Sequence, residues 1–281
     1  MTQTTIQPTA ALNLDNIYQD LFNTAITNPG KLADYYHCFY SYSFGNMLFL
    51  MEQGITSPVA TFKRWSSQGR KIIKGSKAKS IWIPNTKKGT KEDIDGDLVE
   101  FSYTRFFAKA CIFELNDTTG GEYYSPSVAL PQFDKTKILD SFEIEEIEFS
   151  AEKSLNTQGY AFSTLREIAI NPIAAYPVKT FLHEVAHCLL HARNDDGLVI
   201  AHGLEIPKSL REVEAESTAF IVGSFLGILD ENAQAFSRSY IQNYLAEFPM
   251  QDKTCQRIFG AVDKILKALG NENNVEQVAA A

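Results

Sequence analysis

Apolar and polar positions follow a helical spacing at both ends of the chain and a strand spacing between them. Residues 15–53 repeat apolar and aromatic side chains at helical intervals, and residues 209–269 do so again, which predicts helices in both segments. Residues 60–115 alternate with a period of two, which predicts strands at 80–84, 98–103 and 108–114. Helices and strands gathered in separate segments indicate an α+β fold.

A stretch rich in Gly and Pro separates two parts of the chain. Gly120 and Gly121, followed by Pro126 and Pro131, interrupt the periodic patterns and are typical of a connection between domains. A length of 281 residues fits two domains of ~100–200 residues each. We therefore expect two domains, residues 1–134 and 135–281, with a hairpin tip or loop at 89–97 and a disordered tail at 270–281.

The strongest chemical signal is the segment His-Glu-Val-Ala-His-Cys-Leu-Leu-His, which runs from His183 to His191. On a helix, His183 and His187 project from one face and can bind one metal ion, while Glu184 can take a proton from a water held there. This is the H-E-x-x-H arrangement of zinc peptidases. The flanking residues are apolar, and burying two imidazoles and a carboxylate without a partner is costly, so a metal site is favoured over ordinary helix histidines.

A third protein ligand is expected from the next helix, which carries Glu212, Glu214 and Glu216. Glu212 and Glu216 share a helix face, so one of them is expected to bind the metal while the other accepts the second N–H of a ligand histidine. Glu214 points elsewhere and is expected to be solvated. A solvated acidic face is the alternative for the whole group. His191 is interpreted as a helix-end residue, and His202 is a minor ligand candidate.

The metal itself is expected to be zinc, because neutral imidazole suits this ion and three protein ligands leave a position open for water. Two imidazoles and one carboxylate also accept Mn²⁺, Co²⁺ or Ni²⁺. The longer motif that adds a third histidine to H-E-x-x-H is missing, because Leu190 and Arg193 occupy its Gly and last His positions.

A basic segment lies in the strand-rich part of a chain whose net charge is −8. Residues 63–91 hold ten Lys or Arg and no Asp or Glu, and Trp65 and Trp82 lie among them. Arg105, Phe107 and Lys109 follow. Phosphates attract the cations and unstacked bases pack on aromatic rings, so the mixture favours a single-stranded nucleic acid partner. A solvated basic face, with Trp82 in the core, is the alternative.

Cysteine usage and hydropathy suggest where the protein works. The four cysteines are scattered without a C-x-x-C pair, which predicts unpaired thiols in a reducing compartment. The first residues do not resemble a secretory signal, and no apolar run approaches the ~20 residues that a membrane helix needs. A cytoplasmic location without membrane contact is expected.

The C-terminal part resembles a known family in the order of its motifs. Gly159-Tyr160, the run Arg166-Glu-Ile-Ala-Ile-Asn-Pro172, the H-E-x-x-H helix and the Glu-rich helix are similar to the zincin-like metallopeptidase part of ArdC-type antirestriction proteins, and more distantly to ImmA/IrrE peptidases. The resemblance implies that His183 and His187 are ligands, Glu184 the general base, and Glu212 or Glu216 the third ligand. It also implies that a strand at 166–170 offers its edge to an extended peptide.

The N-terminal part resembles the corresponding domain of ArdC and LtrC-like plasmid proteins. The matching runs are Tyr42-Ser-Phe-Gly-Asn46, Phe62-Lys-Arg-Trp65, Gly69-Arg-Lys-Ile-Ile-Lys-Gly75 and Ala108-Lys-Ala-Cys-Ile-Phe113. Departures are Ser-Lys-Ala-Lys after Gly75 and Glu-Leu-Asn-Asp at 114–117. In that family the domain binds single-stranded DNA. The resemblance, with the basic run, gives these DNA-binding candidates: Asn46, Lys63, Arg64, Trp65, Arg70, Lys71, Lys74 and Lys77.

Together these features predict an antirestriction-type protein. It would bind single-stranded DNA, carry a zinc peptidase site acting on an unknown protein substrate, and protect incoming plasmid or phage DNA. One alternative is a non-catalytic single-stranded DNA-binding protein with a structural or regulatory metal; another is an ImmA-like peptidase that cleaves a specific repressor. The sequence does not single out an oxyanion donor, for which Tyr160, His191 and His202 are candidates.

Overall fold

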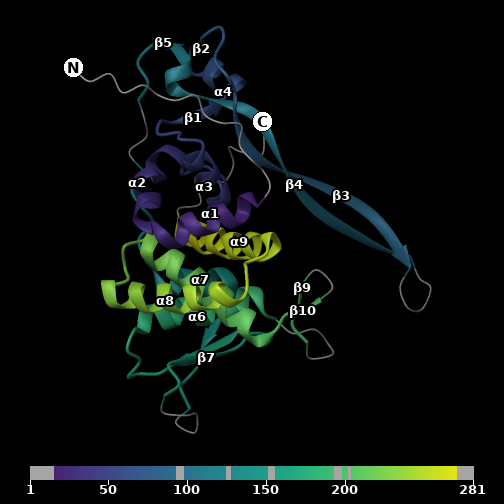
Figure 1. The fold of residues 1–281 in the computed structure, drawn as a ribbon, viewed down its shortest axis with the longest axis vertical. Coiled ribbons are helices and arrows are strands. Elements are labelled where there is room, and N and C mark those ends of the chain that lie inside the picture. The colour runs from purple at the N-terminus through teal and green to yellow at the C-terminus, as the bar shows by residue number, and fades with distance from the viewer. Residues whose placement is uncertain are drawn as a thin grey trace. The chain divides into compact units, whose positions relative to one another are not determined.

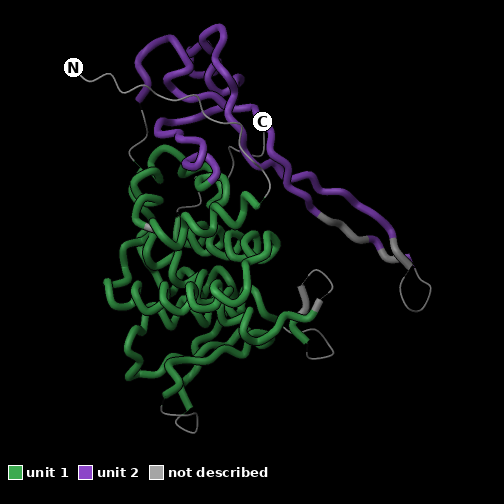
Figure 2. Tube along the Cα trace, in the orientation of Figure 1, with its two compact units in different colours: residues 1–48, 127–280 green, residues 49–126, 281 purple. Residues whose placement is uncertain are grey.

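A computed structural model describes residues 16–92, 98–124, 128–150, 156–192, 198–201 and 204–270. The chain forms two compact units: unit 1 comprises residues 1–48 and 127–280, and unit 2 comprises residues 49–126 (Figure 2). Most of the expected hairpin tip (93–97) and nearly all of the expected tail (271–281) lie outside the described residues.

Unit 1 is mainly helical (Figure 1). Its helices are α1 (Ile17–Thr27), α2 (Pro29–Phe39), most of α3 (Phe44–Glu52), α5 (Lys135–Phe142), α6 (Pro177–Leu190), α7 (Lys208–Phe225), α8 (Glu231–Glu247) and α9 (Asp252–Leu269). Its strands are β6 (Glu145–Glu146), β7 (Gly159–Phe162), β8 (Glu167–Ile170), β9 (Ile200–Ala201) and β10 (Leu204–Glu205).

Helix α7 is the centre of unit 1. Every residue from 213 to 225 is buried, and the helix packs against α2, α6, α8 and α9. A helix that is buried on all sides belongs in a core. Near its end, the Phe225 ring contacts the rings of Tyr36 and Phe44, with centroids 5.6 and 6.3 Å away. The central position of α7 means that polar groups on any of its faces need partners inside the protein.

A small sheet lies against α6 in the strand order β6-β8-β7. Strand β8 pairs in parallel with β6 and antiparallel with β7, where Tyr160 lies opposite Ala169. The expectation that the strand at 166–170 offers its edge is therefore wrong, since β8 is paired on both sides. Within this sheet β7 is the edge strand next to α6. A tight turn with Arg166 in the left-handed region (φ 57°) reverses the chain between β7 and β8.

Unit 2 is built around a long antiparallel hairpin (Figure 1). Its elements are β1 (Val59–Thr61), α4 (Phe62–Ser67), β2 (Arg70–Ile72), β3 (Lys79–Glu92), β4 (Leu98–Glu114), a short 3₁₀ helix (Leu115–Asp117) and β5 (Thr118–Gly120). Strand β4 pairs with β3 and, at its end, with β1, while β2 pairs with β5. The strands expected at 80–84, 98–103 and 108–114 are confirmed as parts of β3 and β4.

The mixed content of helices and strands is confirmed, and the helical segments 15–53 and 209–269 are found as α1–α3 and α7–α9. The compact units divide the chain at 48/49 and 126/127, because α1 and α2 pack on α9 and α7. The domain boundary at residue 134 stays a prediction. None of the four cysteines forms a disulfide. Within the described part of the chain, no helix is long and apolar enough to span a membrane.

Candidate metal centre

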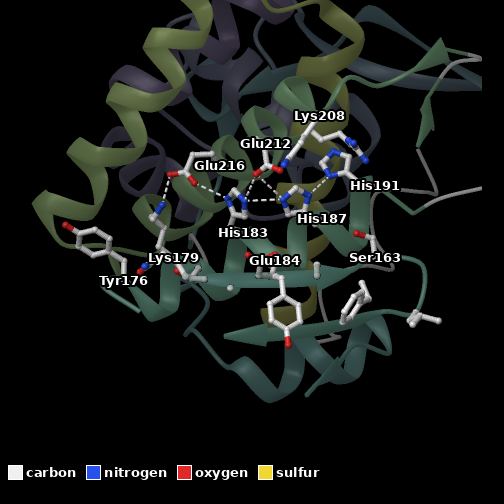
Figure 3. Close-up of a pocket in the computed structure, with 18 of the residues that line it drawn as sticks. Ser163, Tyr176, Lys179, His183, Glu184, His187, His191, Lys208, Glu212 and Glu216 are labelled. Atoms are coloured by element: carbon white, nitrogen blue, oxygen red, sulfur yellow. Dashed lines mark hydrogen bonds and ion pairs between the residues drawn. The ribbon is translucent and has the colours of Figure 1, made fainter. Parts of the chain in front are cut away.

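Helix α6 and helix α7 bring three ligand groups to one point (Figure 3). Pro177 occupies the first position of α6, where its missing N–H costs nothing, and the helix then runs unbroken through the H-E-x-x-H segment. The Nε2 atoms of His183 and His187 are 3.1 Å apart. Glu212 Oε2 on α7 lies 3.4 Å from the first and 3.6 Å from the second. These three side chains form a group that can hold a metal ion.

Glu216 lies outside this group, behind His183. Its Oε2 is 3.0 Å from His183 Nδ1, and its Oε1 accepts a hydrogen bond of 2.7 Å from Lys179 Nζ. Both Glu216 and Lys179 are buried. The sequence left open which glutamate binds the metal. In the structure, Glu212 faces the two Nε2 atoms and Glu216 fixes the orientation of the His183 ring.

A second buried network lies behind His187. His187 Nδ1 is 2.8 Å from His191 Nδ1, and His191 Nε2 is 2.9 Å from Glu214 Oε2. Arg257 on α9 donates to both Glu214 oxygens, at 3.0 and 3.1 Å, and to the Leu190 carbonyl at 2.8 Å. The expectation of a solvated Glu214 is wrong: its exposed fraction is 0% because α7 is surrounded by other helices. His191 does end α6, but it is also buried within this network.

The two networks assign the tautomers of the ligand histidines. A carboxylate only accepts hydrogen bonds, so Glu214 requires the proton of neutral His191 to be on Nε2. His191 Nδ1 then accepts from His187 Nδ1–H, and Glu216 accepts from His183 Nδ1–H in the same way. When both rings are neutral, their Nε2 lone pairs face Glu212, which is the protonation pattern that a metal ligand needs; when a ring is protonated, its Nε2–H donates to Glu212 instead.

The charges around the site also favour a bound cation. Burial acts to lower the pKa of His183, but hydrogen bonds to Glu212 and Glu216 outweigh it and raise the pKa to about 9. Hydrogen bonds from His183 and His187 lower the pKa of Glu212. Glu216 has a pKa of about 2, because His183 and Lys179 outweigh the effect of its burial. A positive charge is therefore stabilised at this point, and the donor set of two imidazoles and a carboxylate fits a divalent ion.

Glu184 has the position expected of a general base. It is buried and lines the same cavity as the three ligand groups. Burial raises its pKa, and the neighbouring charges of His183 and His187 oppose that rise. Gly159 on β7 allows the sheet to pack closely against Glu184 on α6, because it has no side chain. A Cβ at this position would lie 3.0 Å from Glu184 Oε1 and 2.7 Å from Thr180 Cγ2. In the sequence, the only signal for Gly159 is the Gly-Tyr pair that resembles ArdC-type proteins.

The cavity has a volume of about 1020 Å³ and lies between the edge strand β7, the turn that follows it, helix α6 and the start of α7. Two of the candidate oxyanion donors, Tyr160 and His191, line the cavity, and their polar atoms have hydrogen-bond partners within the protein. The Tyr160 hydroxyl accepts a hydrogen bond of 3.1 Å from the Ser150 N–H. His191 is buried behind His187, and burial lowers its pKa to about 4, so it is neutral at pH 7. His202 lies outside the described residues.

The DNA-binding candidates are spread over several elements. Asn46 lies on α3 in unit 1; the others lie on α4, on β2 and in the loop after β2. Trp65 is 1% exposed, and its indole N–H donates to the Phe113 carbonyl at 2.8 Å, so its ring is not accessible to a base. Arg70 donates to Thr118 Oγ1 at 2.8 Å and to the Gly121 carbonyl, which ties β2 to β5. Among the other candidates, Arg64 is half-buried. The exposed candidates are Lys63, Lys71, Lys74 and Lys77.

The hairpin of unit 2 places further cations in a row. Lys109, Phe107 and Arg105 alternate along β4, so they share one face, and Lys87 lies on the same face of β3. All four side chains are exposed; for Phe107 the exposed fraction is 44%. We call these four residues the basic face of the hairpin. Trp82 lies on the opposite face and stacks on Phe49, with ring centroids 4.8 Å apart.

Comparisons with known proteins find a family model for one part of the chain and two similar solved structures. Residues 24–112 match the family model for the N-terminal domain of anti-restriction factor ArdC. No curated protein matches the sequence. Two solved structures of the antirestriction ArdC protein from the R388 plasmid align with the chain. The metal-free one is 18% identical with a TM-score of 0.42, covering 90% of this chain and 95% of that one. The Mn(II)-bound one is 17% identical with a TM-score of 0.37, covering 91% and 99%. Residues 24–112 therefore carry a domain of the type found at the N-terminus of anti-restriction factor ArdC.

Proposed function

We propose that this protein is a metal-dependent peptidase that acts in antirestriction, so that it protects incoming plasmid or phage DNA. The observation that carries the proposal is the convergence of His183, His187 and Glu212 beside the buried carboxylate of Glu184. Zinc is the first candidate for the ion, and Mn²⁺, Co²⁺ and Ni²⁺ fit the same donors. The zincin-like arrangement of the C-terminal part belongs to this proposal.

In the proposed hydrolysis, the metal ion and Glu184 have separate roles. When bound, a divalent ion supplies Lewis acidity, which polarises a carbonyl and lowers the pKa of water. Glu184 takes a proton from the attacking water as the water oxygen bonds to the carbonyl carbon. The C–N bond then breaks, and Glu184 returns the proton to the departing amine. Burial raises the pKa of Glu184, which brings it closer to the working pH and suits a group that both accepts and donates.

The edge strand supports a peptide substrate. Strand β7 lines the cavity along its whole length and pairs with β8 on one side. Its other edge can pair with an extended peptide through main-chain hydrogen bonds, which needs no particular substrate sequence. A chain bound in this way passes Glu184 and the metal group, which line the same cavity.

The test uses Glu184→Gln, which keeps the size of the side chain and removes its charge. Purified wild type and variant are loaded with Zn²⁺, and metal content, cleavage of a denatured protein mixture and protection of incoming DNA in cells are measured. We expect equal metal content, with cleavage and protection both lost in the variant. Undiminished protection would support the non-catalytic alternative with a structural or regulatory metal. Cleavage that is confined to one repressor would support the ImmA-like alternative.

We also propose that unit 2 binds single-stranded DNA, because the basic face of the hairpin combines cations with an exposed aromatic ring. Residues 49–126 hold twelve Lys and Arg against nine Asp and Glu, so this unit is positive in a chain of net charge −8. Arg105 and Lys109 flank Phe107 at a spacing of about 7 Å, two strand residues apart. The cations suit phosphates, and the ring suits an unstacked base.

Replacing Arg105 and Lys109 with Gln tests this partner with a labelled dT20 oligonucleotide and a matched duplex. If both cations contact phosphates, the slope of log affinity against log salt falls by about 1.4, which is ~0.7 for each contact. Phe107→Ala should weaken single-strand binding by ~1–3 kcal/mol and leave duplex binding unchanged. Lys137→Gln, an exposed position on α5, is the control. An unchanged salt slope would make the basic face an ordinary solvated surface.

A further inference from the structure

Two cations of the cleft have no role in the metal networks. Lys208 begins α7 and lies four residues before Glu212, so both side chains share the helix face that borders the cavity. Figure 3 shows Lys208 next to Glu212, on the side of His187. Arg211 lines the same cavity, and its buried Nε has no hydrogen-bond partner among the described residues. Neither side chain belongs to an ion pair in the part of the chain that the structure describes.

These two cations decide the charge of the cleft. Its carboxylates are those of Glu184, Glu212 and Glu216, and Glu216 is already paired with Lys179. A bound divalent ion would balance the charges of the other two carboxylates, Glu184 and Glu212. Lys208 and Arg211 then leave the cleft positive, at the end where α7 begins. A negative side chain of a bound peptide would be attracted there, and the buried Arg211 Nε offers it a hydrogen-bond donor.

The other end of the cleft has an aromatic wall. Tyr176, just before α6, and Phe236 on α8 have ring centroids 6.4 Å apart, and both line the cavity. Phe236 is 57% exposed, although its inner face covers Lys179 Nζ at 4.8 Å. In Figure 3, Tyr176 and Lys179 lie on one side of His183, while Lys208 lies towards His187. An exposed aromatic surface beside the reacting groups suits a large apolar side chain.

We propose that the cleft selects an extended polypeptide segment that carries an acidic side chain on one side of the reacting bond and a large apolar side chain on the other. Lys208 and Arg211 bind the acidic side chain, and Tyr176 and Phe236 contact the apolar one. The inference rests on the proposed peptidase function and names the substrate class of that site. Successive side chains of a segment paired with β7 point to opposite sides, so the two recognised residues need not be adjacent.

Binding to Glu184→Gln protein loaded with Zn²⁺ tests the selection without any turnover. The probes are fluorescein-labelled eight-residue peptides in which one Glu and one Phe occupy every combination of positions in an Ala/Ser background. Each is matched by a peptide with Gln for Glu and by one with Ala for Phe. Charge-assisted hydrogen bonds to two cations should make the best Glu peptide about tenfold tighter than its Gln partner, and high salt should reduce this preference.

Variants then assign the preference to its residues. Adding Lys208→Met should lower the Glu-over-Gln ratio roughly threefold, and adding Arg211→Met as well should abolish it. Phe236→Ala should remove the Phe-over-Ala preference and leave the Glu preference in place. Lys253→Met, an exposed position on α9, should change neither ratio. Equal binding of Glu and Gln peptides, or a preference that survives loss of both cations, would overturn the inference.

Cleavage of the same peptides by wild-type protein separates this inference from the proposed function. If peptides are cut without preference for Glu or Phe, the peptidase proposal stands and the substrate class is wrong. If the Glu- and Phe-containing peptides bind selectively but remain uncut, the recognition surface stands and the peptidase proposal is wrong. Cleavage that follows the binding preference supports both.

Discussion

Glu214→Ala is the most informative change in the molecule, because Glu214 joins the metal centre to the fold. Its carboxylate accepts hydrogen bonds from His191 and from Arg257, and it is fully buried. Alanine would leave the guanidinium of Arg257, 17% exposed, without its counter-charge and His191 without its acceptor. His187 would then lose the group that orients its ring. The change should therefore lower both stability and metal affinity.

The expected magnitudes follow from the burial of this network. Removing one partner of a buried ion pair costs ~3–5 kcal/mol, and the slight exposure of Arg257 favours the lower end. Loss of the outer support of a metal-ligating histidine weakens metal binding ~10–100-fold. Urea unfolding in EDTA gives the first quantity without a contribution from the metal. A Zn²⁺ competition titration of the folded variant gives the second.

Two further variants separate charge from packing. Glu214→Gln keeps the side-chain volume, so a metal affinity close to that of Glu214→Ala would show that the negative charge orients His191 and His187. Lys267→Ala on the same helix as Arg257 breaks the exposed pair with Asp263, and should cost at most ~0.5 kcal/mol without changing metal affinity. The reasoning would be refuted if Glu214→Ala bound Zn²⁺ as tightly as wild type, whatever its stability.

Three other predictions follow from single positions. Gly159→Ala should cost ~1–3 kcal/mol in urea unfolding and reduce cleavage, since its Cβ would press on Glu184; Gly30→Ala, with open space around it, should do neither. Burial lowers the pKa of His191 from 6.5 to about 4, so on acidification the unfolded chain binds a proton at this residue before the folded chain does. The free energy of unfolding of the metal-free protein should therefore fall by up to ~3 kcal/mol between pH 6.5 and pH 4. A His191→Gln variant whose free energy of unfolding changes with pH as steeply as that of the wild type would contradict this. Trp65→Ala should destabilise unit 2 by ~3–5 kcal/mol, measured by near-ultraviolet circular dichroism, so any loss of DNA affinity would follow from unfolding.

The sequence was sufficient where the physics is local. The positions of α6 and α7 follow from apolar spacing, and the shared face of His183 and His187 follows from a four-residue interval within one helix. The same four-residue interval predicts that Glu212 and Glu216 share one helix face. These predictions need only the geometry of a single helix, which does not depend on what surrounds it.

Partners from distant segments could not be found in this way. Arg257 lies 43 residues after Glu214 and Lys179 lies 37 before Glu216, and neither distance is a repeat of any local structure. Glu214 was expected to be solvated because helix periodicity gives the direction of a side chain but not what it meets. The free edge of the sheet is not predictable from local sequence for a similar reason, since pairing of β8 with β6 depends on a segment more than twenty residues away. Trp65 among basic residues gives the same sequence signal whether it stacks on a base or fills a core.

The three glutamates of α7 connect these observations. Glu212 and Glu216 differ by about 40° around the helix, and Glu214 points roughly the opposite way from both. On a surface helix Glu214 would need no partner, but residues 213–225 of α7 are all buried, so the carboxylates of Glu214 and Glu216 each require a positive or donating group. Glu212 meets the metal-binding Nε2 atoms, Glu216 meets Lys179, and Glu214 meets Arg257. Glu216 also orients the ring of His183, and Glu214 orients that of His187 through His191. The ion pairs that neutralise buried charge in the core therefore also fix the geometry of the metal ligands. Loss of either cation should therefore reduce stability and metal affinity together, a coupling that a surface-built metal site would not have.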